Sequence, residues 1–426
     1  MPSTPFFTRT DLRVVLLCFF GYSGAYFGRL DMVASILPMQ EALGWTKAQL
    51  GGISSCFFVA YAGGQLASGI LAHFFNPRWS FGLAVVGTAL MNLLVPFVPS
   101  LVPPDSSLAA MRVVWFLNGA AQSLMWCSVV KAMAQRVSER AMPRAIIVIS
   151  STISLGTVAA FGSAALGAEL RFWQGPFLLA AAWLGLAAAL WFALYRFPED
   201  AARAGAPHAA AKAYPRATRW TGEGRPENAR PMREIVAFVA AASLACAACG
   251  YLRDGLSTWS ANALKDVFGL KNSISILLAL ALPLVGLFGA YLNKRYRDRE
   301  PLVFRMTSVC FALATALVGA SLLAIQRTSL GLAIVAFAGV YLAMIMVTNA
   351  ITSIFCLAYR RLFDAALVAG IVDTACYVAS SFATWSLGRA ADAGGWSRVF
   401  GLLALAGLAG LLFSVAATRL ERRCAR

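Results

Sequence analysis

Long apolar runs alternate with short polar segments along most of the chain. Four of these runs carry no charged residue: Leu50–Ala72, Ile146–Leu166, Pro176–Tyr195 and Ile274–Leu292. A helix needs about 20 apolar residues to cross the hydrocarbon core of a bilayer. The pattern therefore predicts an all-α, multi-pass membrane protein.

The same pattern, followed from end to end, predicts twelve membrane spans. The first apolar stretch lacks a signal-peptide cleavage site and is one of many spans, so we expect it to be a retained helix. The expected spans are 12–37, 49–72, 79–98, 108–134, 143–167, 174–196, 233–263, 273–292, 302–325, 329–358, 364–388 and 398–418.

A polar segment divides these spans into two sets of six. Pro198–Pro231 is rich in Ala, Arg, Gly and Pro and has no apolar periodicity, which is typical of a flexible linker. The expected organisation is an N-terminal six-helix bundle in residues 1–197, a cytoplasmic linker in 198–232 and a C-terminal six-helix bundle in 233–426.

The two halves also resemble each other. Tyr26–Arg29 in the first span has a counterpart in Tyr251–Arg253 of the seventh, and the two arginines are 224 residues apart. Gly69–His73 and Gly289–Asn293 are similarly related, at a separation of 220 residues. Repeats related by an axis along the membrane normal are a transporter architecture, with the binding site at the repeat interface.

Composition supports the membrane prediction and explains the net charge of +17. Apolar residues make up 59% of the chain and charged residues 13%, which is unlike a water-soluble domain. Of the 36 Lys and Arg residues, 26 fall in alternate loops and the two tails, and eight in the intervening loops. This asymmetry places both termini in the cytoplasm, in a bacterial inner membrane, and it removes the case for nucleic-acid binding.

The residue inventory argues against an enzyme. The two histidines, His73 and His208, fall at a helix end and in the linker, and we find no P-loop, metal cluster or nucleophile–base arrangement. Cys246 and Cys249 form a C-x-x-C pair without a second pair, so we interpret them as small packing residues. No cofactor and no metal are expected.

Arg29 and Arg253 are the most informative residues, because each lies deep inside a predicted span. A charge at that depth costs about 2.5–3.5 kcal/mol unless it faces water or a counter-charge. The neighbouring acids, Asp31 and Asp254, could neutralise them, but adjacent helical residues point about 100° apart and i,i+2 residues nearly opposite. We therefore favour an anion site formed by both arginines.

Two guanidinium groups facing one another suit a ligand with several acceptor oxygens. Phosphate and phosphate monoesters fit best, since each planar fork can engage two oxygens, and a dicarboxylate also fits. Tyr26, Gln65 and Tyr251 are the expected polar or aromatic neighbours of this substrate-binding site.

Asp373 is a further charge inside a predicted span. Buried acids in transporters are often proton-relay groups. A fixed partner for an arginine, an anchor between helices and direct substrate contact are the alternatives. We assign Asp373 to coupling or gating.

Several segments resemble the organophosphate:phosphate antiporters of the major facilitator superfamily. The resemblance is strongest at the two arginines and extends in patches over the whole chain. The segments that carry it are Phe20–Arg29, Leu50–Ser54, Ala60–Tyr61, Gly69, Asn76–Arg78, Tyr251–Ser260, Gly370–Tyr377 and Gly395–Trp396. The resemblance implies the major facilitator fold, alternating access, exchange of a phosphate ester for inorganic phosphate, and Arg29 and Arg253 as phosphate ligands.

The chain also departs from that family. The glycerol-3-phosphate and hexose-phosphate carriers have lysines where we align Leu30 and Gln65, and a histidine in the fifth helix, where Val148–Gly156 offers only serines and a threonine. The acidic position at the end of the second helix is His73. A site with fewer cations should bind a less charged ligand or use polar groups instead.

We therefore predict a secondary active transporter of a small phosphorylated or other organic anion that works by rocker-switch alternating access. Inorganic phosphate or a proton is the coupling ion, and the functional unit is a monomer in the bilayer. A proton-coupled carboxylate or drug transporter of the same fold, and a non-transporting sugar-phosphate sensor, are the alternatives.

The charge asymmetry gives a topology prediction. A reporter fused after Arg225 should be cytoplasmic, and reporters inserted near Asp105 or Arg327 should be periplasmic, because the basic loops stay inside. Alkaline phosphatase and fluorescent-protein fusions measure this directly. A linker found outside the cell overturns the orientation.

Overall fold

The computed structural model describes residues 7–71, 76–196, 232–297, 300, 302–359, 362–363 and 365–425, and every regular element assigned within them is helical. This confirms the all-α fold class. The expected linker, apart from its last residue, lies outside the described residues.

Among the described residues, the N-terminal half holds ten α-helices and one short 3₁₀ helix, η1. Several of these helices follow one another without a loop and together form one bent rod. They are α1 (Arg9–Ala34), α2 (Ile36–Leu43), α3 (Lys47–Leu71), α4 (Pro77–Leu94), η1 (Val95–Phe97), α5 (Val98–Leu101), α6 (Pro104–Ser123), α7 (Met125–Arg136), α8 (Met142–Ser150), α9 (Thr152–Glu169) and α10 (Gly175–Leu194).

The C-terminal half repeats this style of construction. Its helices are α12 (Met232–Phe268), α13 (Asn272–Ala279), α14 (Ala281–Gly286), α15 (Gly289–Arg297), α16 (Val303–Gln326), α17 (Leu330–Asn349), the π-helical η3 (Ala350–Phe355), α18 (Cys356–Ala358) and α19 (Ala365–Ala425).

Within the described residues, ten helical stretches are long and apolar enough to cross a membrane. The last of them, Leu367–Arg423, contains two of the predicted spans. The predicted first span is helical as α1, but it is not among the ten, and α1 carries Asp11, Arg13, Arg29 and Asp31. The expected count of twelve is thus matched only in part.

Gly395 separates the two spans that α19 contains. Its φ of 70° lies in the left-handed region, which glycine adopts without a steric penalty. The chain reverses there, so the stretch before Gly395 and the stretch after it form two rods. This agrees with the predicted boundary between the last two spans.

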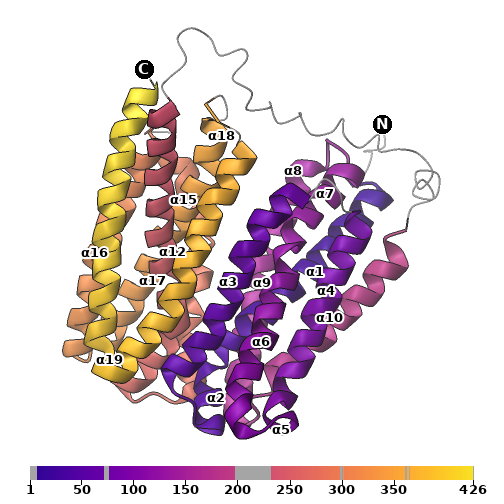
Figure 1. Ribbon diagram of the computed structural model, residues 1–426, viewed down its shortest axis with the longest axis vertical. Helices are drawn as coiled ribbons and strands as arrows, with labels where there is room; N and C mark the ends of the chain where they lie inside the picture. Colours follow the sequence, from indigo (N-terminus) through magenta and orange to yellow (C-terminus); the bar gives the residue numbers. More distant parts are fainter. Residues whose placement is uncertain are drawn as a thin grey trace, which may run out of the picture.

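The helices form two bundles that lie side by side (Figure 1). α1–α10 make one bundle and α12–α19 the other, and the start of α1 and the end of α19 lie at the same end of the molecule, which we call the termini end. The bundles lean together at the opposite end, near α2 and the bend of α19, which we call the closed end.

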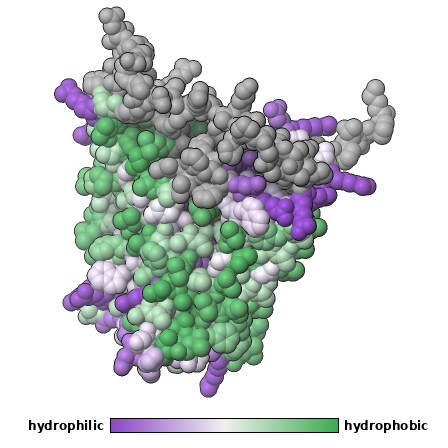
Figure 2. Space-filling view, turned by 45° about the vertical axis from the view of Figure 1, so that its right-hand side comes forward, coloured by the Kyte–Doolittle hydropathy of each residue, from purple (hydrophilic) through white to green (hydrophobic). Residues whose placement is uncertain are grey.

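The surface suits a bilayer. Figure 2 shows an apolar band between hydrophilic residues at the two ends. Large apolar side chains stand exposed on several helices, among them Leu179, Val335, Leu405 and Leu412. Apolar exposure on this scale is characteristic of a surface in contact with lipid rather than water.

At the closed end, α3 and α19 pack tightly across the two halves. The Ser55 and Ser381 hydroxyls are 2.7 Å apart, and the Ser381 hydroxyl also lies 3.1 Å from the Ser55 carbonyl oxygen. A Cβ at Gly51 would collide with the Thr384 carbonyl and the Trp259 ring. Glycine at this position is therefore needed for the close approach of the helices.

A polar network covers this contact at the closed end. Asp392 accepts the backbone N–H groups of Lys47 and Ala48 at 3.3 and 2.8 Å, and so caps the start of α3 from the other half. The Lys47 ammonium pairs with Asp266 at 3.0 Å. These bonds join α3 of the N-terminal half to α12 and α19 of the C-terminal half.

A second pair crosses the halves nearby. The Lys265 ammonium lies 2.7 Å from the Glu41 carboxylate, and its hydrogen bond holds the pKa of Glu41 below the usual range. Asn262 donates to the Gln40 amide oxygen at 2.5 Å. The closed end is therefore held by several weak polar contacts rather than by one strong one, which is suited to a seal that opens.

Candidate functional site

Arg29 lies inside a cage of aromatic rings. Its guanidinium carbon is 5.1, 5.6 and 4.7 Å from the ring centres of Phe57, Phe58 and Tyr61 on α3. It is 5.4 Å from the ring of Tyr377 on α19. Ring faces attract a cation electrostatically, by about 2 kcal/mol or more where water is excluded. The cage thus holds Arg29 with contacts from both halves.

Asp31 does not neutralise Arg29. It is fully buried, and its Oδ1 accepts the Met32 backbone N–H at 2.7 Å. Its other oxygen has no hydrogen-bond partner among the described residues. The prediction that this acid does not meet its arginine is confirmed for Arg29, whose side chain is partly exposed.

The backbone beside Arg29 is held by side chains from other helices of the same bundle. The Gly28 carbonyl accepts hydrogen bonds from the side-chain amides of Asn92, Asn118 and Gln122 at 3.1, 2.9 and 3.2 Å. These three donors come from α4 and α6. They tie α1 to its own bundle at the residue before Arg29, so the guanidinium is presented from a rigid segment.

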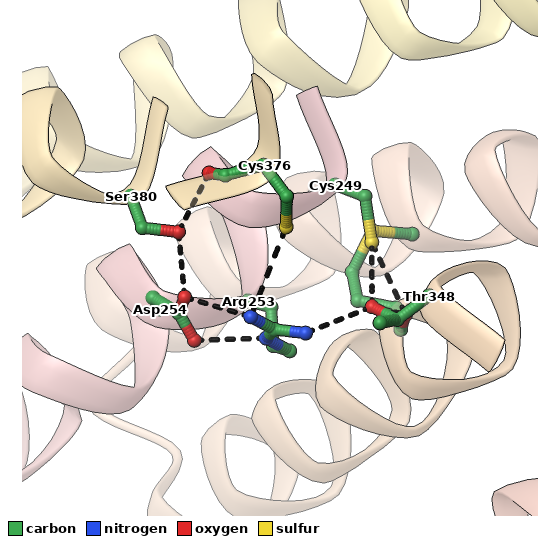
Figure 3. Close-up of polar contacts among 7 residues, drawn as sticks. Cys249, Arg253, Asp254, Thr348, Cys376 and Ser380 are labelled. Atoms are coloured by element: carbon green, nitrogen blue, oxygen red, sulfur yellow. Dashed lines mark hydrogen bonds and ion pairs between the residues drawn. The ribbon is translucent and has the colours of Figure 1, made fainter. Parts of the chain in front are cut away.

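Arg253 is held in a different way (Figure 3). Its Nε and Nη2 donate to the two carboxylate oxygens of Asp254, each at 2.8 Å. Its Nη1 donates to Thr348 Oγ1 at 2.9 Å, and Nη2 lies 3.9 Å from Cys376 Sγ. Arg253 is therefore engaged by a bidentate ion pair with buried surroundings on α12, α17 and α19.

The expectation that Asp254 would not meet Arg253 is wrong. That expectation followed from the directions in which the two Cβ atoms leave the helix, about 100° apart. The long arginine side chain can bend back around the helix to its neighbour. Burial makes this bend favourable, because an unpaired charge in the interior is far more costly than a strained approach.

One face of α19 joins the two arginines. Asp373, Cys376, Tyr377 and Ser380 follow an i, i+3, i+4, i+7 spacing, which places them on one side of the helix. Tyr377 contacts Arg29, Cys376 contacts Arg253, and the Ser380 hydroxyl donates to Asp254 at 2.6 Å. Arg29 and Arg253 thus both contact the same short segment of α19.

Asp373 lies one turn before Tyr377. It is partly exposed and makes no ion pair or hydrogen bond with any described residue. The Arg253 guanidinium is nevertheless near enough to act electrostatically on this carboxyl group. Asp254 in turn lies within electrostatic range of Arg29. The site therefore contains two guanidinium groups and two carboxylates, and only one carboxylate is bonded to an arginine.

Of the other three predicted substrate-binding residues, two lie beside the aromatic cage and one does not. Tyr26 lies three residues before Arg29 on α1 and packs edge-to-face on Tyr22 with ring centres 5.2 Å apart, and the Gln65 side chain hydrogen-bonds to that of Tyr61. Both border the cage. Tyr251 points elsewhere: two residues before Arg253 on the helix, its hydroxyl bonds to Ser386 at 3.0 Å.

Sequence reasoning missed most of the cage. Phe57 and Phe58 gave no signal of a role, because aromatic residues are common in apolar spans. Tyr61 and Tyr377 did stand in segments of family resemblance, and a polar hydroxyl inside a span could have marked them. Asp254 was noticed but was set aside.

The site lies directly beside the closed end. Ser381, which bonds to Ser55, follows Tyr377 by one helical turn on α19. Tyr61 of the cage lies on α3, within two turns of Ser55. The contacts that shut the closed end therefore begin where the arginine site ends.

Comparison with known proteins agrees with this architecture. A sequence profile described as Major Facilitator Superfamily matches residues 15–384. The chain aligns over nearly its full length with a D-xylose-proton symporter (TM-score 0.72, 12% identity, 96% of this chain and 97% of that one). It aligns similarly with a bacterial homolog of the human lysosomal transporter Spinster (TM-score 0.67, 16% identity, 98% and 97%).

Sequence relatives match over shorter segments. A probable anion transporter 4, chloroplastic, of Oryza sativa subsp. japonica is 27% identical over 43% of this chain and 29% of its own length. The glycerol-3-phosphate transporter of Bacillus subtilis (strain 168) is 28% identical over 36% and 34%. A probable hexose phosphate transport protein of Chlamydia pneumoniae is 29% identical over 27% and 24%.

The matched segments thus span about a third or less of each relative's length. The relatives' names are consistent with the resemblance to organophosphate:phosphate antiporters, and the solved structures share the two-bundle fold. Neither group contains an enzyme. From the profile match over most of its length, the chain belongs to the Major Facilitator Superfamily.

Proposed function

We propose that this transporter moves a small organic anion, phosphorylated or otherwise, by rocker-switch alternating access. The observation that carries the proposal is the meeting of Arg29 and Arg253 at one segment of α19, around Cys376 and Tyr377. Each arginine is supplied by a different half of the molecule. An anion bound between them would contact both halves at once.

The chemistry of the site favours an anion over a neutral or cationic ligand. Arg29 has no acidic partner among the described residues and is surrounded by rings instead. A guanidinium so placed keeps its planar donor fork available for carboxylate or phosphate oxygens. The aromatic faces exclude water, which strengthens each hydrogen bond that a ligand forms there.

The names of the relatives support the anion class. Transporters of glycerol 3-phosphate, of hexose phosphate and of unspecified anions are among them. On this basis we propose phosphate esters as the first substrates to test and exchange with inorganic phosphate as the first coupling mode. The basic loops support the further proposal that the termini end faces the cytoplasm.

The position of the closed end supports the proposal of alternating access. Contacts between α3 and α19, and the ion pair of Lys47 with Asp266, join the two halves between the arginine site and one side of the molecule. These contacts must break when the two bundles rock about the site. An anion held by both arginines would draw the bundles together around it, which couples binding to that motion.

Asp373 is our candidate for the coupling or gating group. Its carboxylate shares a helix face with Tyr377, is partly exposed, and acts on Arg253 without being bonded to it. Such a group can gain or lose a proton without breaking an existing ion pair. A change in its charge would alter how firmly Arg253 is held.

The first prediction from this site concerns the two arginines. Arg29→Lys should weaken substrate binding about ten- to hundred-fold, because a lysine keeps the charge but loses the planar fork. Arg253→Lys should weaken it by a similar factor, because a lysine cannot hold Asp254 through two parallel bonds and leaves this carboxylate free to repel the anion. A hydrogen bond to a charged group contributes about 1.5–3 kcal/mol. Equilibrium binding of labelled phosphate esters to the purified protein measures the loss.

Arg327→Lys is a matched control, because Arg327 is exposed at a helix end. It should bind and transport as the wild type does. Normal affinity in either site variant, with the protein folded, would mean that the arginines are structural and that the anion lies elsewhere.

The second prediction concerns Asp373. Asp373→Asn should keep substrate affinity within a few-fold while changing the pH dependence of transport, since the proposed proton acceptor is removed without touching the arginines' direct bonds. Uptake into proteoliposomes at a series of pH values checks it. A collapse of affinity with an unchanged pH profile would instead make Asp373 a ligand or an anchor.

A further inference from the structure

The Asp254 carboxylate binds the Arg253 guanidinium in the way that a substrate anion would. Both carboxylate oxygens lie 2.8 Å from guanidinium nitrogens, in the parallel two-bond arrangement that arginine forms with carboxylates and phosphates (Figure 3). The remaining terminal nitrogen, Nη1, donates to Thr348 at 2.9 Å. The Nε/Nη2 fork of Arg253 is therefore already filled.

Asp254 is itself held in place from the other side of the site. The Ser380 hydroxyl donates to its Oδ2 at 2.6 Å, and the same hydroxyl oxygen lies 2.9 Å from the Cys376 carbonyl oxygen. The side chain of Asp254 is only 16% exposed. The ion pair is therefore a built part of the interior, between α12 and α19, and not an incidental surface contact.

Arg29, in contrast to Arg253, is not paired with a carboxylate of the described residues. It faces four aromatic rings, and among the described residues it has neither an acidic partner nor a hydrogen-bonded one. The site thus presents one guanidinium fork that is available and one that is closed by an internal carboxylate.

We infer that Asp254 sets the charge of the ligand: it holds Arg253 as an internal counter-ion, so that the site accepts a singly charged head group at Arg29. This inference rests on the proposed function, because it assumes that the arginine site binds an anion. A doubly charged head group needs the second fork, and it gains that fork only by displacing Asp254. Phosphate monoesters, whose second pKa is about 6, carry mostly two charges at neutral pH and meet this obstacle.

The test compares two probes that differ in charge but share a tetrahedral head group. 3-Hydroxypropanesulfonate carries one negative charge, and 3-hydroxypropylphosphonate carries two at alkaline pH. Their affinities are measured by ligand-induced thermal stabilisation of the purified full-length protein at one alkaline pH. The readout is the ratio of the two affinities, which does not depend on transport.

The wild type should prefer the sulfonate by about tenfold or more. Asp254→Asn keeps the size of the side chain but removes its charge, and it should shift the ratio toward the phosphonate by about ten- to hundred-fold. Asp105→Asn is the matched control, because Asp105 is exposed in the first turn of α6. It should keep the wild-type ratio.

Folding of the variant is checked separately. Without its partner, Arg253 is a buried uncompensated charge, so Asp254→Asn should melt below the wild type, and the phosphonate should restore its melting temperature more than the sulfonate does. Asp254→Glu retains the charge, serves as a second variant, and should keep the preference for the sulfonate.

Failure of this inference and failure of the proposed function give different results. If the wild type binds the phosphonate as well as the sulfonate, or if Asp254→Asn leaves the ratio unchanged, the assignment to Asp254 is overturned and the anion site stands. If the folded wild type binds neither probe nor any phosphate ester, the proposed function itself fails.

Discussion

A guanidinium group inside a membrane protein must be compensated, and this requirement organises the centre of the molecule. Arg29 and Arg253 lie at comparable depth in the first helix of each half. Arg29 is surrounded by ring faces from α3 and α19, and Arg253 is paired with the carboxylate of its neighbour. The arginines at equivalent positions in the two halves are thus compensated in different ways, one by aromatic rings and one by a carboxylate. The resulting asymmetry leaves one donor fork available and closes the other.

The same helix, α19, connects this compensation to closure. Its residues Cys376, Tyr377 and Ser380 contact the arginines and Asp254, while Ser381 and Thr384 bind α3 and Trp259 at the closed end. Together, these two sets of residues occupy less than three turns of α19. A ligand that changes the position of α19 at Tyr377 would therefore also move the residues that form the contacts at the closed end.

Much of the fold could be predicted from the sequence, because a membrane span is a local property of about 20 residues. The apolar runs predicted most of the helices and the boundary between the last two spans. The first span was harder, since the charges in α1 lower its apolar character. The predicted linker falls almost wholly outside the described residues, so its prediction stays untested.

The site was less predictable because its contacts join distant segments. Phe57 and Phe58 become cage residues only through the packing of α3 against α1, which no local pattern encodes. Asp254 was misjudged because an ideal helix fixes the direction of Cβ but not the path of a long side chain. Tyr251 was chosen for its place beside Arg253 in the repeat, yet helix geometry turns it away, toward Ser386. The roles assigned to Tyr26, Gln65 and Asp373 remain predictions.

The central claim is that two arginines, one from each half, form a single transport site for an anion. Counterflow measures this most directly: proteoliposomes loaded with inorganic phosphate or unlabelled anion are diluted into a panel of labelled phosphate esters and carboxylates. The account predicts transient accumulation of at least one labelled anion by the wild type, and none by a folded protein that carries both Arg29→Ala and Arg253→Ala. Saturable binding of the same anions without any flux in the wild type, or counterflow that persists in the double variant, would contradict it.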